Sequence, residues 1–389
     1  MSKIVAIITE YNPFHNGHKY QIDKIREEIP NATIIAIMSG NTVQRGEFAF
    51  TDKYTRAEMA IKCGIDAVFE LPFPYSCATA EIFASAGVEI ASKLGADYLY
   101  FGTESDNCEN LEKIAIALDS QAFNNQIKEL NHGEFLSYPA LREKALSNVG
   151  LKLSNMSNDI LAIEYIRAIK NKNLNLEYRA IKREGAGYKD RNICDIMSAS
   201  AIREHYYTTN QLLSVPENAK AVLEAKLSEG KINDKNLTNR LLLSHIILNS
   251  AQTIEQKFDV PSGMGYYILE CAKKCKNIEH FTDELSSKGF TTARLKRAVI
   301  YALFDVNFID RTPSFTILLG ANEKGKKVIS SSRKMGNIAI ITKYANSKKL
   351  SNSFKEAFEK SVKVDELYST LYAKPQPIDE LYKSKPYIN

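Results

Sequence analysis

The stretch IITEYNPFHNGHKY, residues 7–20, contains two histidines three positions apart, directly after an apolar run. Residues 3–8 predict a buried strand, and the apolar spacing of residues 18–28 predicts a helix. Between them, the proline favours an extended conformation at the preceding Asn12, and Gly17 leaves the start of the helix free of a side chain. A strand, a tight turn and a helix in this order begin a crossover unit, so the stretch predicts a parallel sheet.

Further along, short apolar runs alternate with segments of helical periodicity. This alternation predicts an α/β fold with a Rossmann-like parallel sheet, because each crossover helix returns the chain to start the next strand in the same direction. The predicted strands are residues 32–38, 67–70, 98–101 and 176–183. The predicted helices are residues 54–63, 78–94, 111–118, 138–147 and 159–170.

Beyond residue 206 the pattern becomes helical, with apolar residues spaced three and four positions apart. One strand-like run, SFTILLG at 314–320, interrupts this pattern. We therefore expect an α/β domain over residues 1–206 and a basic, mainly α-helical domain over residues 207–389. The predicted helices of the second domain are residues 212–227, 237–248, 264–275 and 292–303.

The composition is that of a globular protein, with 44% hydrophobic and 25% charged residues. The apolar runs are much shorter than the roughly 20 residues that a membrane span requires, so we expect a cytoplasmic protein with no membrane partner. The six cysteines include no CxxC pair, which predicts reduced thiols. Cys271 and Cys275 lie one helical turn apart but have no second ligand pair nearby, so no metal site is predicted.

Charge is distributed unevenly along the chain. Residues 1–206 carry 23 Lys and Arg against 27 Asp and Glu, whereas residues 207–389 carry 28 against 19. A basic excess in one half is compatible with an ordinary solvated surface, but it also suits a platform for a polyanion such as RNA. The cations that we expect to bind RNA are Lys273, Lys274, Lys276, Arg294, Lys296 and Arg297.

His15 and His18 lie where the predicted strand ends and the helix begins, which is where ligands bind in an open parallel sheet. Free N–H groups at a helix N-terminus attract an anion, and two imidazoles beside them add donors for a polyphosphate. Zinc would need further ligands that the neighbouring sequence lacks. We therefore predict that both histidines are catalytic and stabilise the charge that develops as pyrophosphate leaves.

A second motif, IMSASAIRE at residues 196–204, closes the predicted α/β domain. Ser198 and Ser200 are suited to cap a helix and bind phosphate, and Arg203 is suited to stabilise the leaving group from the opposite side. Alone, this motif would be an ordinary helix cap with a surface arginine. Together with HNGH at 15–18, it resembles the paired signatures of the HxGH nucleotidyltransferase superfamily.

Longer segments narrow this resemblance to the tRNA(Met) cytidine acetate ligase family. They are residues 7–20, 38–76, 96–105, 157–169, 181–190 and 198–204, and more weakly 291–303. The resemblance implies that ATP activates acetate as acetyl-adenylate, and that the acetyl group passes to the wobble cytidine of elongator tRNA(Met), giving N(4)-acetylcytidine. It also implies an ATP site formed by Ile7, Ile8, Thr9, Glu10, Tyr11, Asn12, Pro13, Phe14, His15, Asn16, Gly17, His18, Lys19, Tyr20, Gly102, Asn158 and Arg183.

Some of these positions also have simpler interpretations. Gly102 fits a turn, Asn158 fits a helix N-cap, and Arg183 fits a surface pair with Glu184. Two other functions remain open for the chain as a whole: a small-molecule adenylyltransferase or ligase of cofactor biosynthesis, and a non-catalytic RNA-binding module. The sequence predicts no particular oligomeric state.

The expected chemistry is direct attack of acetate on the α-phosphorus of ATP. The protein then supplies positioning and charge neutralisation, and no protein nucleophile is needed. Magnesium would accompany ATP, held mainly by phosphates and water. Gln44 and Arg45, in a polar loop after the second predicted strand, are candidates to face acetate or tRNA.

Overall fold

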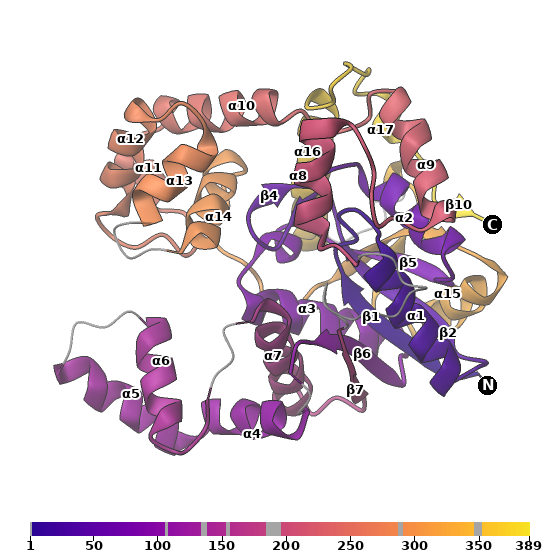
Figure 1. Ribbon diagram of the computed structural model, residues 1–389, viewed down its shortest axis with the longest axis horizontal. Coiled ribbons are helices and arrows are strands. Elements are labelled where there is room, and N and C mark those ends of the chain that lie inside the picture. The colour runs from indigo at the N-terminus through magenta and orange to yellow at the C-terminus, as the bar shows by residue number, and fades with distance from the viewer. Residues whose placement is uncertain are drawn as a thin grey trace.

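The computed structural model describes residues 2–105, 108–133, 138–152, 156–183, 196–286, 291–345 and 352–389. Its centre is a mostly parallel sheet with the strand order β10-β8-β5-β2-β1-β6-β7, in which β9 also pairs with β8 (Figure 1). The predicted α/β fold is thus confirmed. The strands are β1 (Ile4–Thr9), β2 (Thr33–Ser39), β5 (Ala67–Leu71), β6 (Tyr98–Thr103), β7 (Glu177–Lys182), β8 (Phe315–Ala321), β9 (Ala339–Ile341) and β10 (Tyr387–Ile388).

The strand order reverses beside β1. This strand lies between β2 and β6 and runs parallel to both. From β1 the chain builds outward through β2 and β5, and then returns to add β6 and β7 on the other side. A reversal of this kind opens a crevice at the carboxyl ends of the two strands between which it occurs. Here that crevice lies after Thr9 of β1 and beside Gly102 of β6.

Alternate side chains of β1 face two hydrophobic clusters, which is why its sequence is continuously apolar. Ala6 and Ile8 pack with residues of α3 (Ala80–Lys93) and α7 (Ser157–Asn171) on one face. Val5 and Ile7 pack with residues of α1 (Asn16–Glu28) and α2 (Lys53–Lys62) on the other face. Because helices cover both faces, a ligand can approach the centre of the sheet only at the ends of its strands.

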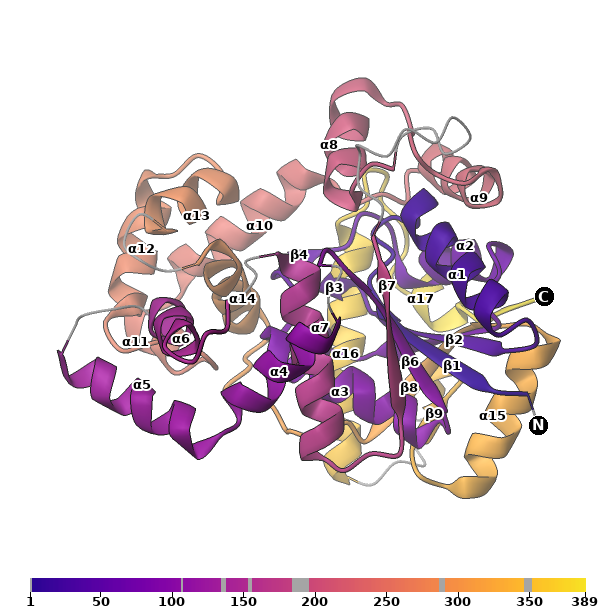
Figure 2. The same ribbon diagram turned by 60° about the horizontal axis from the view of Figure 1, so that its bottom comes forward.

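The remaining elements surround this core. The helices α4, α5 and α6 extend away from the sheet, and α10 to α14 form a helical group beside it in both views (Figures 1 and 2). None of the helices in the described part of the chain is both long enough and apolar enough to cross a membrane. The bounds are α4 (Cys108–Leu118), α5 (Gln121–Gly133), α6 (Tyr138–Ser147), α8 (Ala199–Thr209), α9 (Glu217–Ser228), α10 (Lys235–Leu248), α11 (Ala251–Glu255), α12 (Met264–Lys274), α13 (Ile278–Ser286), α14 (Thr292–Leu303), α15 (Glu323–Met335), α16 (Asn352–Thr370) and α17 (Glu380–Lys383), with β3 (Thr42–Val43), β4 (Glu47–Phe48) and the 3-10 turn η1 (Tyr75–Cys77).

The expected division of the chain at residue 206 does not follow the sheet. The strands β8, β9 and β10 all come from beyond that residue, and β8 joins the sheet antiparallel to β5. Every residue of β8 is buried, so the run SFTILLG belongs to the sheet and is not an insert in a helical domain. Pairing with β5 satisfies the backbone of this apolar strand, which could not stay exposed. The chain therefore leaves the sheet after β7, builds α10 to α14, and returns to complete the sheet.

Candidate active site

The two predicted motifs meet at the crevice beside β1 and β6. A cavity of about 540 Å³ lies there, between the starts of α1 and α8 and the end of β6. Segments that are far apart in the sequence therefore face one space. Of the predicted site residues, those that line the cavity are Ile8, Thr9, Glu10, Tyr11, Asn12, His15, Gly17, His18, Tyr20, Gln44, Arg45, Gly102, Asn158, Arg183, Ser198, Ser200 and Arg203.

His15 is the N-cap of α1, and its ring and that of His18 are held by backbone N–H groups. The His15 backbone is extended, and its Nδ1 accepts a hydrogen bond from the Gly17 N–H at 3.0 Å. The His18 ring reaches back, and its Nδ1 accepts from the His15 N–H at 3.2 Å. A neutral imidazole that accepts through Nδ1 carries its proton on Nε2. Each ring therefore offers an Nε2–H donor, and the two rings stack with their centroids 3.7 Å apart.

Both histidines are held in the neutral form. Loss of hydration, and then the charge of Arg183, lower the pKa of the His15 imidazole from 6.5 to about 3. Loss of hydration, followed by His15 and Arg183, also lowers the pKa of His18 well below its ordinary value. Near pH 7 the pair can thus donate two hydrogen bonds to phosphate oxygens without carrying a buried positive charge.

The turn between β1 and α1 is fixed by contacts with distant segments. Tyr11 has a left-handed backbone, with a φ of 46°, which is costly for an aromatic residue unless its surroundings hold it. Its buried ring packs against Phe14, with centroids 4.8 Å apart. The Asn12 side chain accepts from the Phe50 N–H at 2.7 Å, and the Asn12 carbonyl accepts from Nη1 of Arg203 at 2.7 Å. The second contact brings the Arg203 guanidinium beside the HNGH motif.

The start of α8 lies against the start of α1. Ser198 is the N-cap of α8, and its hydroxyl accepts from the Ala201 N–H at 3.2 Å and lies 3.1 Å from the hydroxyl of Ser200. The residue that joins the two helix starts is Ser214, which the sequence did not single out. Its carbonyl accepts from the Asn16 N–H at 2.9 Å, and its hydroxyl accepts from the Met197 N–H at 3.1 Å. Two helix N-termini and two hydroxyls therefore face the same cavity, an arrangement suited to a polyphosphate.

The opposite wall of the cavity is formed by the ends of β6, β7 and α7. A side chain at Gly102 would lie 3.1 Å from Cγ of Arg183, so glycine leaves room for that arginine. Nη1 of Arg183 donates to Oδ1 of Asn158 at 3.4 Å, and Nδ2 of Asn158 donates to Glu104. Glu104 and Asp159 each accept from the other's backbone N–H, at 3.0 and 2.9 Å. This mutual capping fixes Asn158 and Arg183 in one linked network; Glu184 lies outside the described residues.

Five residues of the predicted ATP site do not line the cavity. Ile7 and Phe14 are buried in a hydrophobic cluster on the α1 face of the sheet. The Lys19 ammonium pairs instead with Asp23, one turn further along α1. Ile7 faces the α1 side of its strand and Lys19 lies on the outer face of its helix, so neither side chain reaches the cavity. The five residues are Ile7, Pro13, Phe14, Asn16 and Lys19.

The predicted RNA-binding cations fall into two groups. Lys273, Lys274 and Lys276 are exposed at the end of α12 and just after it. Nζ of Lys273 pairs with Glu270 at 2.7 Å, an exposed ion pair that contributes little to stability. These lysines are open to solvent, and their contact with RNA stays a prediction.

The cations of α14 make contacts within the protein. Nη2 of Arg294 lies 2.9 Å from Asp259, and Nζ of Lys296 lies 2.7 Å from Glu47. The Arg297 side chain is only 8% exposed and lies near Asp259. These three cations therefore join α14 to neighbouring segments, and do not form one exposed basic stripe with the α12 lysines.

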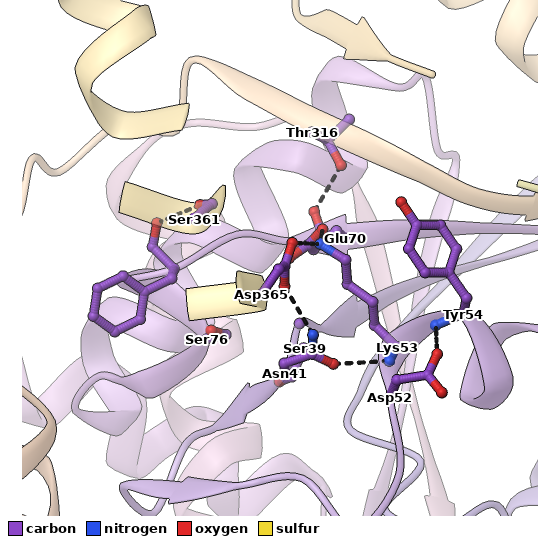
Figure 3. A network of polar contacts seen from close by, with 12 residues as sticks. Ser39, Asn41, Asp52, Lys53, Tyr54, Glu70, Ser76, Thr316, Ser361 and Asp365 are labelled. Atoms are coloured by element: carbon purple, nitrogen blue, oxygen red, sulfur yellow. Dashed lines mark hydrogen bonds and ion pairs between the residues drawn. The ribbon is translucent and has the colours of Figure 1, made fainter. Parts of the chain in front are cut away.

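Two buried cations near the site carried no signal in the sequence. Arg56 is fully buried and donates to the carbonyls of Thr51, Glu10, Ser39 and Gly40, so it braces the ends of β1 and β2. The second cation, Lys53, belongs to a buried cluster that holds the loop after β2, and we call this the Lys53 cluster (Figure 3). Its members are Asn41, Lys53, Glu70 and Asp365.

Comparison with known proteins identifies relatives over the full length of the chain. A model described as HIGH nucleotidyl transferase matches residues 2–382. The chain is 33% identical over 404 residues to the tRNA(Met) cytidine acetate ligase of Halothermothrix orenii, with 96% of each chain covered. It is 35% identical over 392 residues to that of a Thermoanaerobacter species, with 95% of each covered. A crystal structure of Thermotoga maritima TmcAL bound with alpha-thio ATP matches 99% of each chain, with 28% identity and a TM-score of 0.88.

Proposed function

The chain belongs to the HIGH nucleotidyltransferase family and, within it, to the ATP-binding tRNA(Met) cytidine acetate ligases, and we propose that it works through acetyl-adenylate. In this proposal acetate and ATP react first, and the acetyl group then passes to the wobble cytidine of elongator tRNA(Met). The family and enzyme class predicted from the sequence are confirmed by the full-length relatives. The intermediate, the acceptor position and the residue roles are the proposal.

One observation carries the proposal: two neutral histidines and a second helix start face one cavity at the switch point of the sheet. The Nε2–H groups of His15 and His18 would donate to the triphosphate. Ser198, Ser200 and the Arg203 guanidinium would contact it from α8. Gly102, Asn158 and Arg183 line the opposite wall, where the nucleoside would lie.

In the first step an acetate oxygen attacks the α-phosphorus, an O–P bond forms, and the bond to pyrophosphate breaks. Negative charge builds up on the leaving group, and donors that are already oriented stabilise it without reorganisation. The described residues contain no group of three or more His, Cys, Asp and Glu that could hold a metal ion. Mg²⁺ would therefore be held by the phosphates and water, where it would supply further charge neutralisation.

In the second step the exocyclic amine of cytidine attacks the acetyl carbon, and AMP leaves. Cytidine is a weak nucleophile, so the base must be unstacked and brought close to the adenylate. The exposed Lys273, Lys274 and Lys276 are candidates to hold the tRNA backbone for this step.

The proposal is tested by incubating the purified protein with ATP, acetate and tRNA(Met), and analysing the tRNA nucleosides by mass spectrometry. We expect N(4)-acetylcytidine at the wobble position, with pyrophosphate release that depends on acetate. Release that depends on another small acid, with no acetyl group on tRNA, would favour the small-molecule ligase. A chain that binds tRNA but shows no heat of ATP binding would be an RNA-binding module.

A further inference from the structure

Glu10 has no role in the scheme described so far, although its side chain lines the cavity. It follows β1 directly and is half-buried. Among the described residues, only the Gln44 N–H donates to its carboxylate, to Oε1 at 2.9 Å. The second carboxylate oxygen is thus left for a ligand.

The charge of Glu10 makes it unsuited to hold ATP. A carboxylate repels a triphosphate, whereas the histidines, serines and arginines around the cavity attract one. Two cations, Arg203 and Arg45, lie close enough to stabilise the Glu10 carboxylate electrostatically, and Glu47 opposes them. Two nearby guanidinium groups disfavour a metal ion at this carboxylate, but they leave a neutral N–H group free to approach it.

The surroundings of Glu10 fit a flat, partly apolar ligand. Ile8, Phe83, Phe101 and Tyr165 line the same cavity, and Tyr165 lies close enough to Glu10 to feel its charge. The rings of Phe101 and Tyr165 pack with their centroids 5.7 Å apart. A nucleobase needs such an apolar surface along its faces and a polar group at its edge. The exocyclic amine of cytosine is a donor on that edge, and Glu10 is an acceptor.

We propose that Glu10 accepts the proton that the cytosine amine loses when its nitrogen attacks acetyl-adenylate. This inference rests on the proposed function and assigns the base of its second step. The N–C bond to the acetyl carbon forms, the C–O bond to the phosphate of AMP breaks, and the amine proton moves to the free carboxylate oxygen. AMP leaves with the electron pair of the broken bond.

Two features of the structure support this role. Burial raises the pKa of the Glu10 carboxyl above its ordinary value, against the opposing effects of the Gln44 N–H and of Arg203 and Arg45. A carboxylate with a raised pKa is a stronger base. The backbone at Glu10 is also held in place, because the Glu10 backbone carbonyl accepts from Nη1 of the buried Arg56 at 2.7 Å.

The decisive variant is Glu10→Gln, which keeps the shape of the side chain and an oxygen for the Gln44 N–H but cannot accept a proton. Transfer is measured in a single turnover, by adding tRNA(Met) to enzyme that already holds labelled acetyl-adenylate. Adenylate formation is measured separately, as acetate-dependent acetyl hydroxamate with hydroxylamine. We expect transfer to fall by about 10²–10³-fold, and hydroxamate formation to fall by less than about 10-fold.

Two further variants complete the test. Glu10→Asp retains a base, so it should recover part of the transfer rate. If Glu10→Gln does not fold, the ratio of the transfer rate to the rate of hydroxamate formation in Glu10→Asp tests the inference. Glu58→Gln removes a carboxylate of α2 that is paired with Lys62 and does not line the cavity, so it should not slow transfer selectively. Circular dichroism and thermal unfolding verify that each variant is folded.

Three results would overturn the inference: transfer by Glu10→Gln within 10-fold of wild type, an equal loss of both steps, or a raised Mg²⁺ requirement for hydroxamate formation. The last would assign Glu10 to the metal. Absence of acetylated cytidine with the wild-type enzyme is a separate result, because it would overturn the proposed function and this inference with it.

Discussion

Two groups of polar side chains near the carboxyl ends of the strands differ in how they are paired. In the Lys53 cluster, Nζ of Lys53 lies 2.7 Å from Glu70 and 2.6 Å from Asp365. Asp365 also accepts from Asn41 and from Tyr344, each at 2.8 Å. Around the HNGH motif, by contrast, backbone N–H groups fix only one nitrogen of each ring, and the other nitrogen is left as a donor beside a cavity.

This difference separates a structural group from a ligand-binding one. A buried polar group is costly unless its hydrogen bonds are made, so a cluster whose members satisfy one another needs no ligand. A cluster whose members are oriented by backbone contacts, but keep free donors toward a cavity, is prepared for a ligand. Both groups are buried and both contain titratable residues, so burial alone would not tell them apart.

The largest effect on stability is expected for Lys53→Met. The change leaves Glu70 and Asp365 buried without their cation, which should lower the free energy of unfolding by about 3–5 kcal/mol. Lys62→Met on the same helix is the matched control, because Lys62 pairs with Glu58 at an exposed site and should change stability by less than about 1 kcal/mol. Urea unfolding of both variants provides the measurement. A loss of adenylate formation at full stability would show that the Lys53 cluster is functional.

For His18→Ala we expect a large loss of activity with little loss of stability. Adenylate formation, measured as acetate-dependent pyrophosphate release, should fall by about 10²–10³-fold, because a donor to the leaving group is lost. His15→Ala should reduce adenylate formation similarly and leave tRNA affinity nearly unchanged, but loss of its helix cap should lower the free energy of unfolding by about 0.5–2 kcal/mol. The exposed His280 on α13 provides a control that should retain full activity when changed to alanine. Equal loss of adenylate formation and tRNA affinity would mean that the histidines maintain the fold.

The sequence predicted the histidines of the HNGH motif better than it predicted the Lys53 cluster. The strand, the turn, HNGH and the helix are adjacent in the chain, so local pattern placed both histidines at the end of β1. The Lys53 cluster joins residues as far apart as Asn41 and Asp365, and nothing in the local pattern specifies such a partner. For the same reason the sequence showed an apolar run at 314–320 but not its antiparallel pairing with β5.

Charge patterns were the least informative part of the sequence. ARLKR at 293–297 has the composition of an RNA-binding helix, yet Arg294 and Lys296 pair with Asp259 and Glu47, far away in the chain. The number of cations is read from sequence, whereas their pairing depends on tertiary contacts. Any role of α14 in tRNA binding must therefore be separated from its role in packing.

A smaller effect is expected from the pH dependence of stability. The pKa of His15 is about 3 in the folded protein and 6.5 when unperturbed, so between these values the unfolded chain binds more protons. Stability should therefore rise with pH through this window, and be lost as pH falls below about 6.5. From pH 6.5 to 5, His15 alone should account for roughly 2 kcal/mol. Denaturant unfolding of wild type and His15→Ala at several pH values measures this, and parallel curves would contradict it.

The smallest effects are expected for the exposed lysines, which extend the comparison to the surface. Lys274 and Lys276 make no ion pair with any residue that the structure describes, so they are free to contact phosphates. Changing either to alanine should weaken tRNA binding several-fold and reduce the slope of log affinity against log salt by about 1. Lys296→Ala should leave this slope nearly unchanged, because Lys296 is bound to Glu47. Filter binding over a salt series separates the two cases: if Lys296→Ala changes the slope and the α12 variants do not, internal pairing does not decide which cations bind tRNA.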